Sequence, residues 1–239
     1  MRRVVRAFWG PRPESVETLA GRWKRTLDGI TGLLPAPASP GGAGAGTWRQ
    51  AHGTGPETEL PADEGALLGA LRVARTAEDW SDLTGTALRL DRTGEAGWRT
   101  ETSGLAGGSP EFLLQSFVVT LHAPDGADVP EAELLALLAR EWEPDFGDVS
   151  DDDVLDALED DAGYSVGDPV VGRVGYLSPA RAALLPEDLK AAREELTGGG
   201  VLLRVAAAGA SADVVAAYEQ LRDAGALEPL PRPMDRPVL

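Results

Sequence analysis

The 239-residue sequence contains no cysteine and only two histidines. The lack of cysteine excludes disulfide bonds, thiolate metal sites and thiol nucleophiles, and it is typical of proteins from a reducing compartment. The two histidines, His52 and His122, are too few for a histidine metal cluster, and neither is placed as an obvious general base. We therefore expect no metal and no cofactor.

Long apolar runs are also missing. No stretch of about 18 apolar residues occurs, so the sequence predicts no membrane-spanning helix. The apolar run near the N-terminus is interrupted by Arg6 and ends at Gly10 and Pro11, which makes it too short for a secretory signal. Basic patches with interleaved aromatic residues are absent, so we expect no nucleic-acid binding. These absences together predict a soluble cytoplasmic protein.

Basic residues are absent from residues 141–172, which carry twelve carboxylates. The remaining 27 acidic residues face 22 basic residues, so most of the net charge of -17 is local. Two aromatic rings, Trp142 and Phe146, lie among the first of these carboxylates. A negative field beside exposed rings attracts a basic macromolecule, although carboxylates after Ser150 also fit the solvated first turn of a helix.

Apolar periodicity and turn residues predict the elements of one α+β domain. We expect helices at residues 15–34, 63–74 and 130–142, another from Ser150, a helical piece around 186–196, and a last helix at 211–225. We expect strands at residues 4–9, 86–90, 97–102, 113–121, 170–177 and 200–206. This order favours a mainly antiparallel sheet with flanking helices over a regular βαβ alternation. Trp9 and Trp23 are expected in its core.

Two segments are expected to lie outside the domain, which we place at residues 1–34 and 62–228. Residues 35–61 are rich in Gly, Pro and Ala, so they cannot bury enough apolar surface to order themselves, and we predict a flexible loop or linker. Their glycine run lacks the features of a phosphate-binding loop. Residues 229–239 are expected to form an extended Pro-rich tail.

Two catalytic alternatives stay open. Residues 163–167 match the G-x-S-x-G pattern of a hydrolase elbow around Ser165, but acidic residues precede it where a strand is required, and both histidines come earlier in the chain. The carboxylates from Asp148 to Asp156 are hard oxygen ligands of the kind that Ca²⁺ or Mg²⁺ prefers, without the spacing of an EF-hand. The alternative function is therefore a hydrolase using Ser165 or a metal-dependent activity at Asp148 to Asp156.

Four segments, in chain order, carry a family resemblance. They are FWGPRPES at residues 8–15, WEPDFG at 142–147, VGYLS at 174–178 and GGVL at 199–202. Together they resemble the immunity protein 52 family of bacterial polymorphic toxin systems, and the resemblance covers most of the chain. It implies an α+β cytoplasmic antidote without catalytic residues, which binds and neutralises a toxin encoded beside it. For this family the suspected toxins carry a restriction-endonuclease-like nuclease domain.

The acidic and aromatic segment is compatible with this implied role. A nuclease needs a basic cleft for phosphates, and a surface of carboxylates and rings is complementary to such a cleft. We therefore expect a non-enzymatic protein whose partner is a basic nuclease toxin, with no nucleic acid and no membrane as partner. The residues expected to contact the toxin are Trp142, Glu143, Asp145, Phe146, Asp148, Asp151, Asp152 and Asp156. A scaffold for some other protein is a third class that the sequence does not separate from an antidote.

Overall fold

The computed structural model describes residues 1–35, 47–52, 55–78, 80–94, 97–207 and 209–239. Its strands are β1 (Arg2–Trp9), β2 (Trp48–Gln50), β3 (Thr58–Glu59), β4 (Thr86–Thr93), β5 (Arg99–Ala106), β6 (Gln115–His122), β7 (Phe146–Ser150), β8 (Val174–Leu177), β9 (Ala192–Glu195) and β10 (Val201–Arg204). Its helices are α1 (Val16–Leu33), α2 (Glu64–Ala74), α3 (Glu131–Trp142), α4 (Asp152–Ala162), α5 (Pro179–Ala182) and α6 (Ser211–Asp223). None of the helices in this part of the chain combines the length and apolar character needed to cross a membrane.

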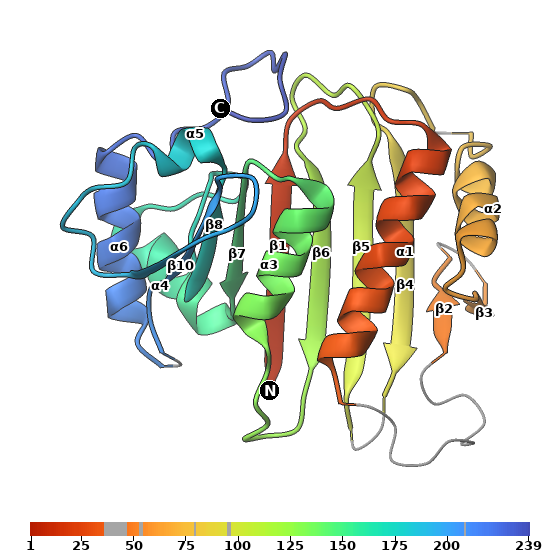
Figure 1. The fold of residues 1–239 in the computed structure, drawn as a ribbon, viewed down its shortest axis with the longest axis horizontal. Helices are drawn as coiled ribbons and strands as arrows, with labels where there is room; N and C mark the ends of the chain where they lie inside the picture. Colours follow the sequence, from red (N-terminus) through yellow and green to blue (C-terminus); the bar gives the residue numbers. More distant parts are fainter. Residues whose placement is uncertain (36–46, 53–54, 79, 95–96, 208) are drawn as a thin grey trace.

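All ten strands form one sheet in the order β3-β2-β4-β5-β6-β1-β7-β8-β10-β9, and every neighbouring pair is antiparallel. Helices flank this sheet (Figure 1). The expected α+β class with a mainly antiparallel sheet is therefore confirmed. The N-terminal strand β1 lies near the middle of the sheet. Strands β2 to β6 are added on one side of β1, and strands β7 to β10 on the other.

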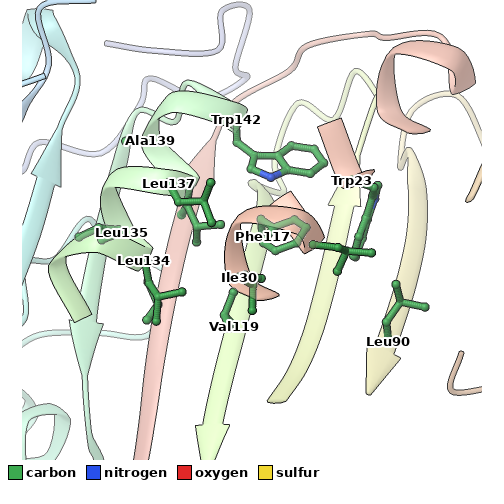
Figure 2. Packing of buried hydrophobic residues seen from close by; sticks show 14 of the residues in the cluster. Trp23, Ile30, Leu90, Phe117, Val119, Leu134, Leu135, Leu137, Ala139 and Trp142 are labelled. Carbon is green, nitrogen blue, oxygen red and sulfur yellow. The ribbon is translucent and has the colours of Figure 1, made fainter. Parts of the chain in front are cut away.

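One face of the sheet, here called the front face, is covered by α1, α2 and α3 (Figure 1). Helix α1 begins where Ser15 accepts a hydrogen bond from the Thr18 N–H, and its stripe of Leu19, Trp23 and Leu27 is fully buried. Trp142 at the end of α3 lies over Phe117 of β6 in the same core (Figure 2). Trp9 and Trp23 are core residues, as expected.

The opposite face, here called the back face, is covered over only part of its width. A second core joins β7, β8 and β10 to α4 and α6, with Phe146, Leu158 and Tyr218 among its members. On β4, β5 and β6 the burial alternates strictly along most of each strand, with buried residues facing the front and exposed or half-buried residues facing the back. The back of these three strands is therefore open to solvent.

Three expectations about elements were wrong. Residues 192–195 form strand β9, because pairing with β10 overrides the helical preference of that stretch. The segment predicted to be flexible contains β2 and β3, since Trp48 finds a buried place against the Arg92 guanidinium at the sheet edge; its residues 36–46 and 53–54 lie outside the described part. Helix α4 is capped by the side chain of Asp151 and not by Ser150.

The C-terminal tail, residues 229–239, contains no helix or strand but packs closely on the domain. Leu230 and Met234 are buried, and the Gly10 N–H donates a hydrogen bond of 2.8 Å to the Pro237 carbonyl. A side chain at position 10 would meet the Arg236 carbonyl at 2.2 Å from its Cβ, so the close approach of the tail requires glycine there.

Candidate functional site

The acidic and aromatic segment after Trp142 forms strand β7, which lies inside the sheet between β1 and β8. Trp142, Asp145, Phe146 and Asp148 are all at most 2% exposed. The prediction that these four residues contact a toxin is therefore wrong in this structure, because buried side chains do not reach a partner. The reason is that each polar member finds a neutralising partner within the fold.

Asp145 is paired with Arg181 at 2.6 Å, and both side chains are fully buried. The Asp145 carboxylate also accepts hydrogen bonds from the Ser178 hydroxyl and from the Leu239 N–H. The Arg181 guanidinium donates in addition to the Ala226 carbonyl. This pair connects the start of β7, helix α5 and the C-terminal residue, so its role is to hold the domain and its tail together.

Asp148 forms a two-point ion pair with Arg6 of β1, with Nε–Oδ1 and Nη2–Oδ2 distances of 3.0 and 2.9 Å. The Ser150 hydroxyl donates to the same carboxylate at 2.5 Å. Burial, the largest single effect, would lower the pKa of the Arg6 guanidinium, but the charge and hydrogen bond of Asp148, together with Tyr164, outweigh it and raise that pKa. The Phe146 ring stacks on Phe8 at 5.2 Å, beside this pair.

Trp142 joins the first two segments that carry the family resemblance. Its ring stacks on Trp9 at 5.5 Å, and its Nε1–H donates to the Thr26 hydroxyl at 2.9 Å. Arg12 donates to the carbonyls of Trp142 and Glu143 at 2.6 and 3.3 Å, which satisfies acceptors that the end of α3 leaves open. These two segments therefore form a structural junction and not a binding surface.

The other predicted contact residues do not form one surface. Glu143 is exposed at the end of α3, where it pairs with Arg22 of α1 on the front side. Asp151 caps α4 and pairs with Arg3 and Arg173; burial would raise its pKa, but the bonds with Arg173 lower it. Asp152 and Asp156 are exposed on α4, behind the sheet. Of the eight predicted residues, only these last two lie together on an open surface.

Helix α4 carries more exposed carboxylates than the prediction named. Asp153, Glu159, Asp160 and Asp161 are exposed with Asp152 and Asp156, while the apolar side of the helix packs into the second core. Of these six, only Asp152 is in an ion pair with a described residue, namely Arg2 at 2.8 Å. The sequence could have identified the additional residues, because in a helix that begins after Asp151 they fall on the side opposite the apolar residues.

One flank of α4 is directed toward β1. Asp152, Asp156 and Glu159 follow each other at intervals of four and three, so they share a side of the helix. The Arg2 guanidinium of β1 pairs with Asp152. Arg2 points to the back of the sheet, because its neighbour Arg3 points to the front, where it bonds Glu131 of α3. We call Asp152, Asp156 and Glu159 the acidic flank.

The uncovered back of β4, β5 and β6 lies beyond β1, and we call it the open face. Its residues are Ala87, Arg89, Asp91, Thr93, Arg99, Glu101, Ser103, Leu105, Ser116, Val118, Thr120 and His122. Val118 lies directly opposite both Arg6 and Ser103, and residues that are directly opposite each other point to the same face. Because Arg6 bonds Asp148 behind the sheet, all of these residues point to the back. Glu101 pairs here with Arg89 and Arg99, each at 3.2 Å, so the charges of the open face are compensated internally.

Asp91 is the buried carboxylate of the open face, and its Oδ1 has no hydrogen-bond partner among the described residues. Burial and then the charge of Glu101 raise the pKa of Asp91, while Arg99, at 3.7 Å, opposes the shift only in part. The native protein therefore holds this proton more tightly than the unfolded chain does. Stability from this group is complete below about pH 4 and is lost as pH rises through the native pKa.

Replacing Asp91 with asparagine is therefore expected to increase the free energy of unfolding at pH 7 by roughly 0.5–1 kcal/mol, because a neutral amide avoids the cost of a buried charge that Arg99 compensates only in part. Urea unfolding of the wild type and of Asp91→Asn at pH 4 and pH 7 checks this. The two proteins should differ less at pH 4, where Asp91 itself is protonated more often. A variant that is less stable at pH 7 would contradict this assignment.

Neither catalytic alternative has the required geometry. Ser165 is exposed in a loop that follows helix α4, whereas a nucleophile elbow requires a strand before the serine and a helix after it. Asp148 and Asp151 are occupied by arginines, and no group of three metal-ligating side chains comes together among the residues that the structure describes. The acidic flank and the open face are the candidate functional surface.

Comparison with known proteins gives no further identification, because no protein-family model and no curated protein sequence matches this chain.

Proposed function

We propose that this protein is a non-enzymatic immunity protein that binds and neutralises a cognate toxin of a bacterial polymorphic toxin system in the cytoplasm. The observation that carries the proposal is the run of exposed carboxylates on α4, of which only Asp152 has a basic partner among the described residues. The resemblance to the immunity protein 52 family supports the same role. The partner is proposed to be a basic nuclease domain of the restriction-endonuclease type.

The charge of α4 suits a basic protein partner for two reasons. Exposed carboxylates without internal partners leave a negative field that raises the encounter rate of a cationic surface. Val154 and Leu158 hold the helix rigidly against the second core, so little conformational entropy is lost when a partner binds. A nuclease needs cationic side chains around its phosphate-binding cleft, and α4 offers carboxylates at fixed intervals to such side chains.

Co-expression tests the proposal in cells. The product of the adjacent open reading frame is expressed in a bacterial host with and without this protein. We expect survival only with this protein, and recovery of a stable complex of nanomolar or tighter affinity, because a few free toxin molecules are harmful. Death of the host despite full expression of this protein, with no recovered complex, would contradict the proposed function.

A Ser165→Ala variant separates inhibition from hydrolysis. Ser165 is exposed in a loop without the strand and helix of a nucleophile elbow, so we expect full protection and unchanged affinity for the toxin. Survival counts and isothermal titration calorimetry measure this. A loss of protection with unchanged affinity would instead favour an enzyme that acts through Ser165. Survival without any complex would favour an activity on something other than the toxin.

A further inference from the structure

Strands β4, β5 and β6 are covered by helices at the front, whereas their back, the open face, has no described element over it. Leu88, Leu90, Phe117 and Val119 point to the front and are at most 3% exposed beneath the helices. Their neighbours along the same strands face the back and, apart from Asp91, stay exposed or half-buried, with no described element over them. An antiparallel sheet with one polar solvated face is common, so the chemistry of this face has to decide whether it binds anything.

The open face is not uniformly polar. Its charged residues gather around Glu101 toward one end, whereas Ser103, Leu105, Ser116 and Val118 form a small and partly apolar area toward the other end. A shallow hollow of about 360 Å³ lies over part of this second area, with Ser103, Leu105 and Ser116 in its lining together with Arg89 and Gln50. We call these four residues the floor.

The floor is bounded by groups that suit a protein partner. The β5–β6 connection begins beside the pair of Leu105 and Ser116, and it exposes Phe112 and Leu113 by 62% and 51%. The acidic flank lies on the far side of β1 from the open face. Arg2, which holds Asp152, is opposite His122, so this end of the flank is level with the charged end of the open face and not with the floor. Large exposed apolar groups next to a partly apolar hollow with a charged rim are the composition of a protein interface.

We infer that a basic protein docks across the open face, with cationic side chains against the acidic flank and an apolar side chain in the floor. This inference rests on the proposed function and extends it from α4 to the whole back of the sheet. Charge complementarity selects this occupant. The four floor residues are uncharged, Arg89 next to them is paired with Glu101, and across β1 the carboxylates of the acidic flank have no basic partner among the described residues except at Asp152. A second copy of this chain would bring a protein of net charge -17 and the same acidic flank against these carboxylates, which electrostatic repulsion opposes.

A bulky residue in the floor tests the inference without changing any charge. Ser103 is exposed on β5, and tyrosine is favoured in strands, so Ser103→Tyr should fold normally while filling the hollow. We expect its affinity for the toxin encoded by the adjacent gene to fall at least tenfold, mainly through faster dissociation, with an unchanged dependence of affinity on salt. Ala192→Tyr, at an exposed position of the edge strand β9, is the matched control, because it also replaces a small uncharged residue, and it should bind as tightly as the wild type.

The outcomes separate this inference from the proposed function. If Ser103→Tyr binds as the wild type does while the complex itself forms, the docking face is wrong and the immunity role stands. If the wild type does not bind the toxin at all, the proposed function fails first. Gel filtration is run on the wild type and on both variants. A wild-type dimer that Ser103→Tyr dissociates would show that a second copy covers the face, and would overturn the inference.

Discussion

Replacing Asp145 with alanine is expected to lower the free energy of unfolding by about 3–5 kcal/mol. The reason is that Arg181 and Asp145 are both fully buried, so the variant leaves a guanidinium charge without its counter-ion in the protein interior. The Ser178 hydroxyl and the Leu239 N–H lose their acceptor at the same time. A loss of this size is a large part of the total stability of a typical domain. Urea unfolding followed by circular dichroism measures it.

Asp152→Ala is the matched control for this prediction. It is the same substitution in another aspartate that pairs with an arginine, but the Asp152 and Arg2 side chains are 75% and 47% exposed. Solvent screens such a pair, so we expect a loss below about 1 kcal/mol. If the two variants were equally stable, the buried pair would not hold β7, α5 and the C-terminus together as described.

Reversing three charges on α4 is expected to weaken toxin binding at least 100-fold at low salt, mainly through slower association. The variant Asp156→Lys, Glu159→Lys, Asp160→Lys changes exposed residues that are in no ion pair with described residues. It replaces attraction for a basic partner by repulsion. Surface plasmon resonance with the purified toxin gives both rate constants.

The same variant should keep its fold. Helix α4 has no basic residue in its last turn, and lysines near a helix C-terminus interact favourably with the helix dipole, so thermal stability should be equal or slightly higher. A control variant, Glu187→Lys, Asp188→Lys, Glu195→Lys, changes the net charge equally at exposed positions before and within β9. It should bind nearly as the wild type does. Equal weakening in both variants would mean that only the net charge matters.

The helices on the front face were predictable because their information is local. The apolar stripe of α1 repeats at helical spacing, and Ser15 and Asp63 cap α1 and α2 with their own side chains. Strand β6 and the middle of β4 alternate apolar and polar residues in the same local way. Their class, order and approximate ends follow from the sequence for this reason.

Strand β7 was missed because its carboxylates are neutralised by distant parts of the chain. Arg6, which neutralises Asp148, is 142 residues away, and Arg181, which neutralises Asp145, is 36 residues away. Nothing in residues 142–150 alone distinguishes these acids from solvated ones. A local charge count therefore predicted a surface at a position where the fold has an interior strand.

The candidate site was predictable only where the acids follow a helix. Asp152 and Asp156 were identified from the local charge, and they remain part of the candidate functional surface. The open face was not identified, since whether a sheet face is covered depends on where α4 and α6 pack after the chain has crossed the sheet. That information is tertiary, and the alternation along β4 and β6 indicates only that one face is more polar.

The most direct test of the central claim is the dependence of toxin affinity on salt concentration for the wild type, the α4 variant and the β9 control variant. Screening weakens attraction between exposed charges, so we expect the dissociation constant of the wild type and of the control to rise steeply and in parallel with salt. The α4 variant should show a much shallower or reversed dependence. Three parallel curves would contradict the claim that α4 meets a basic partner.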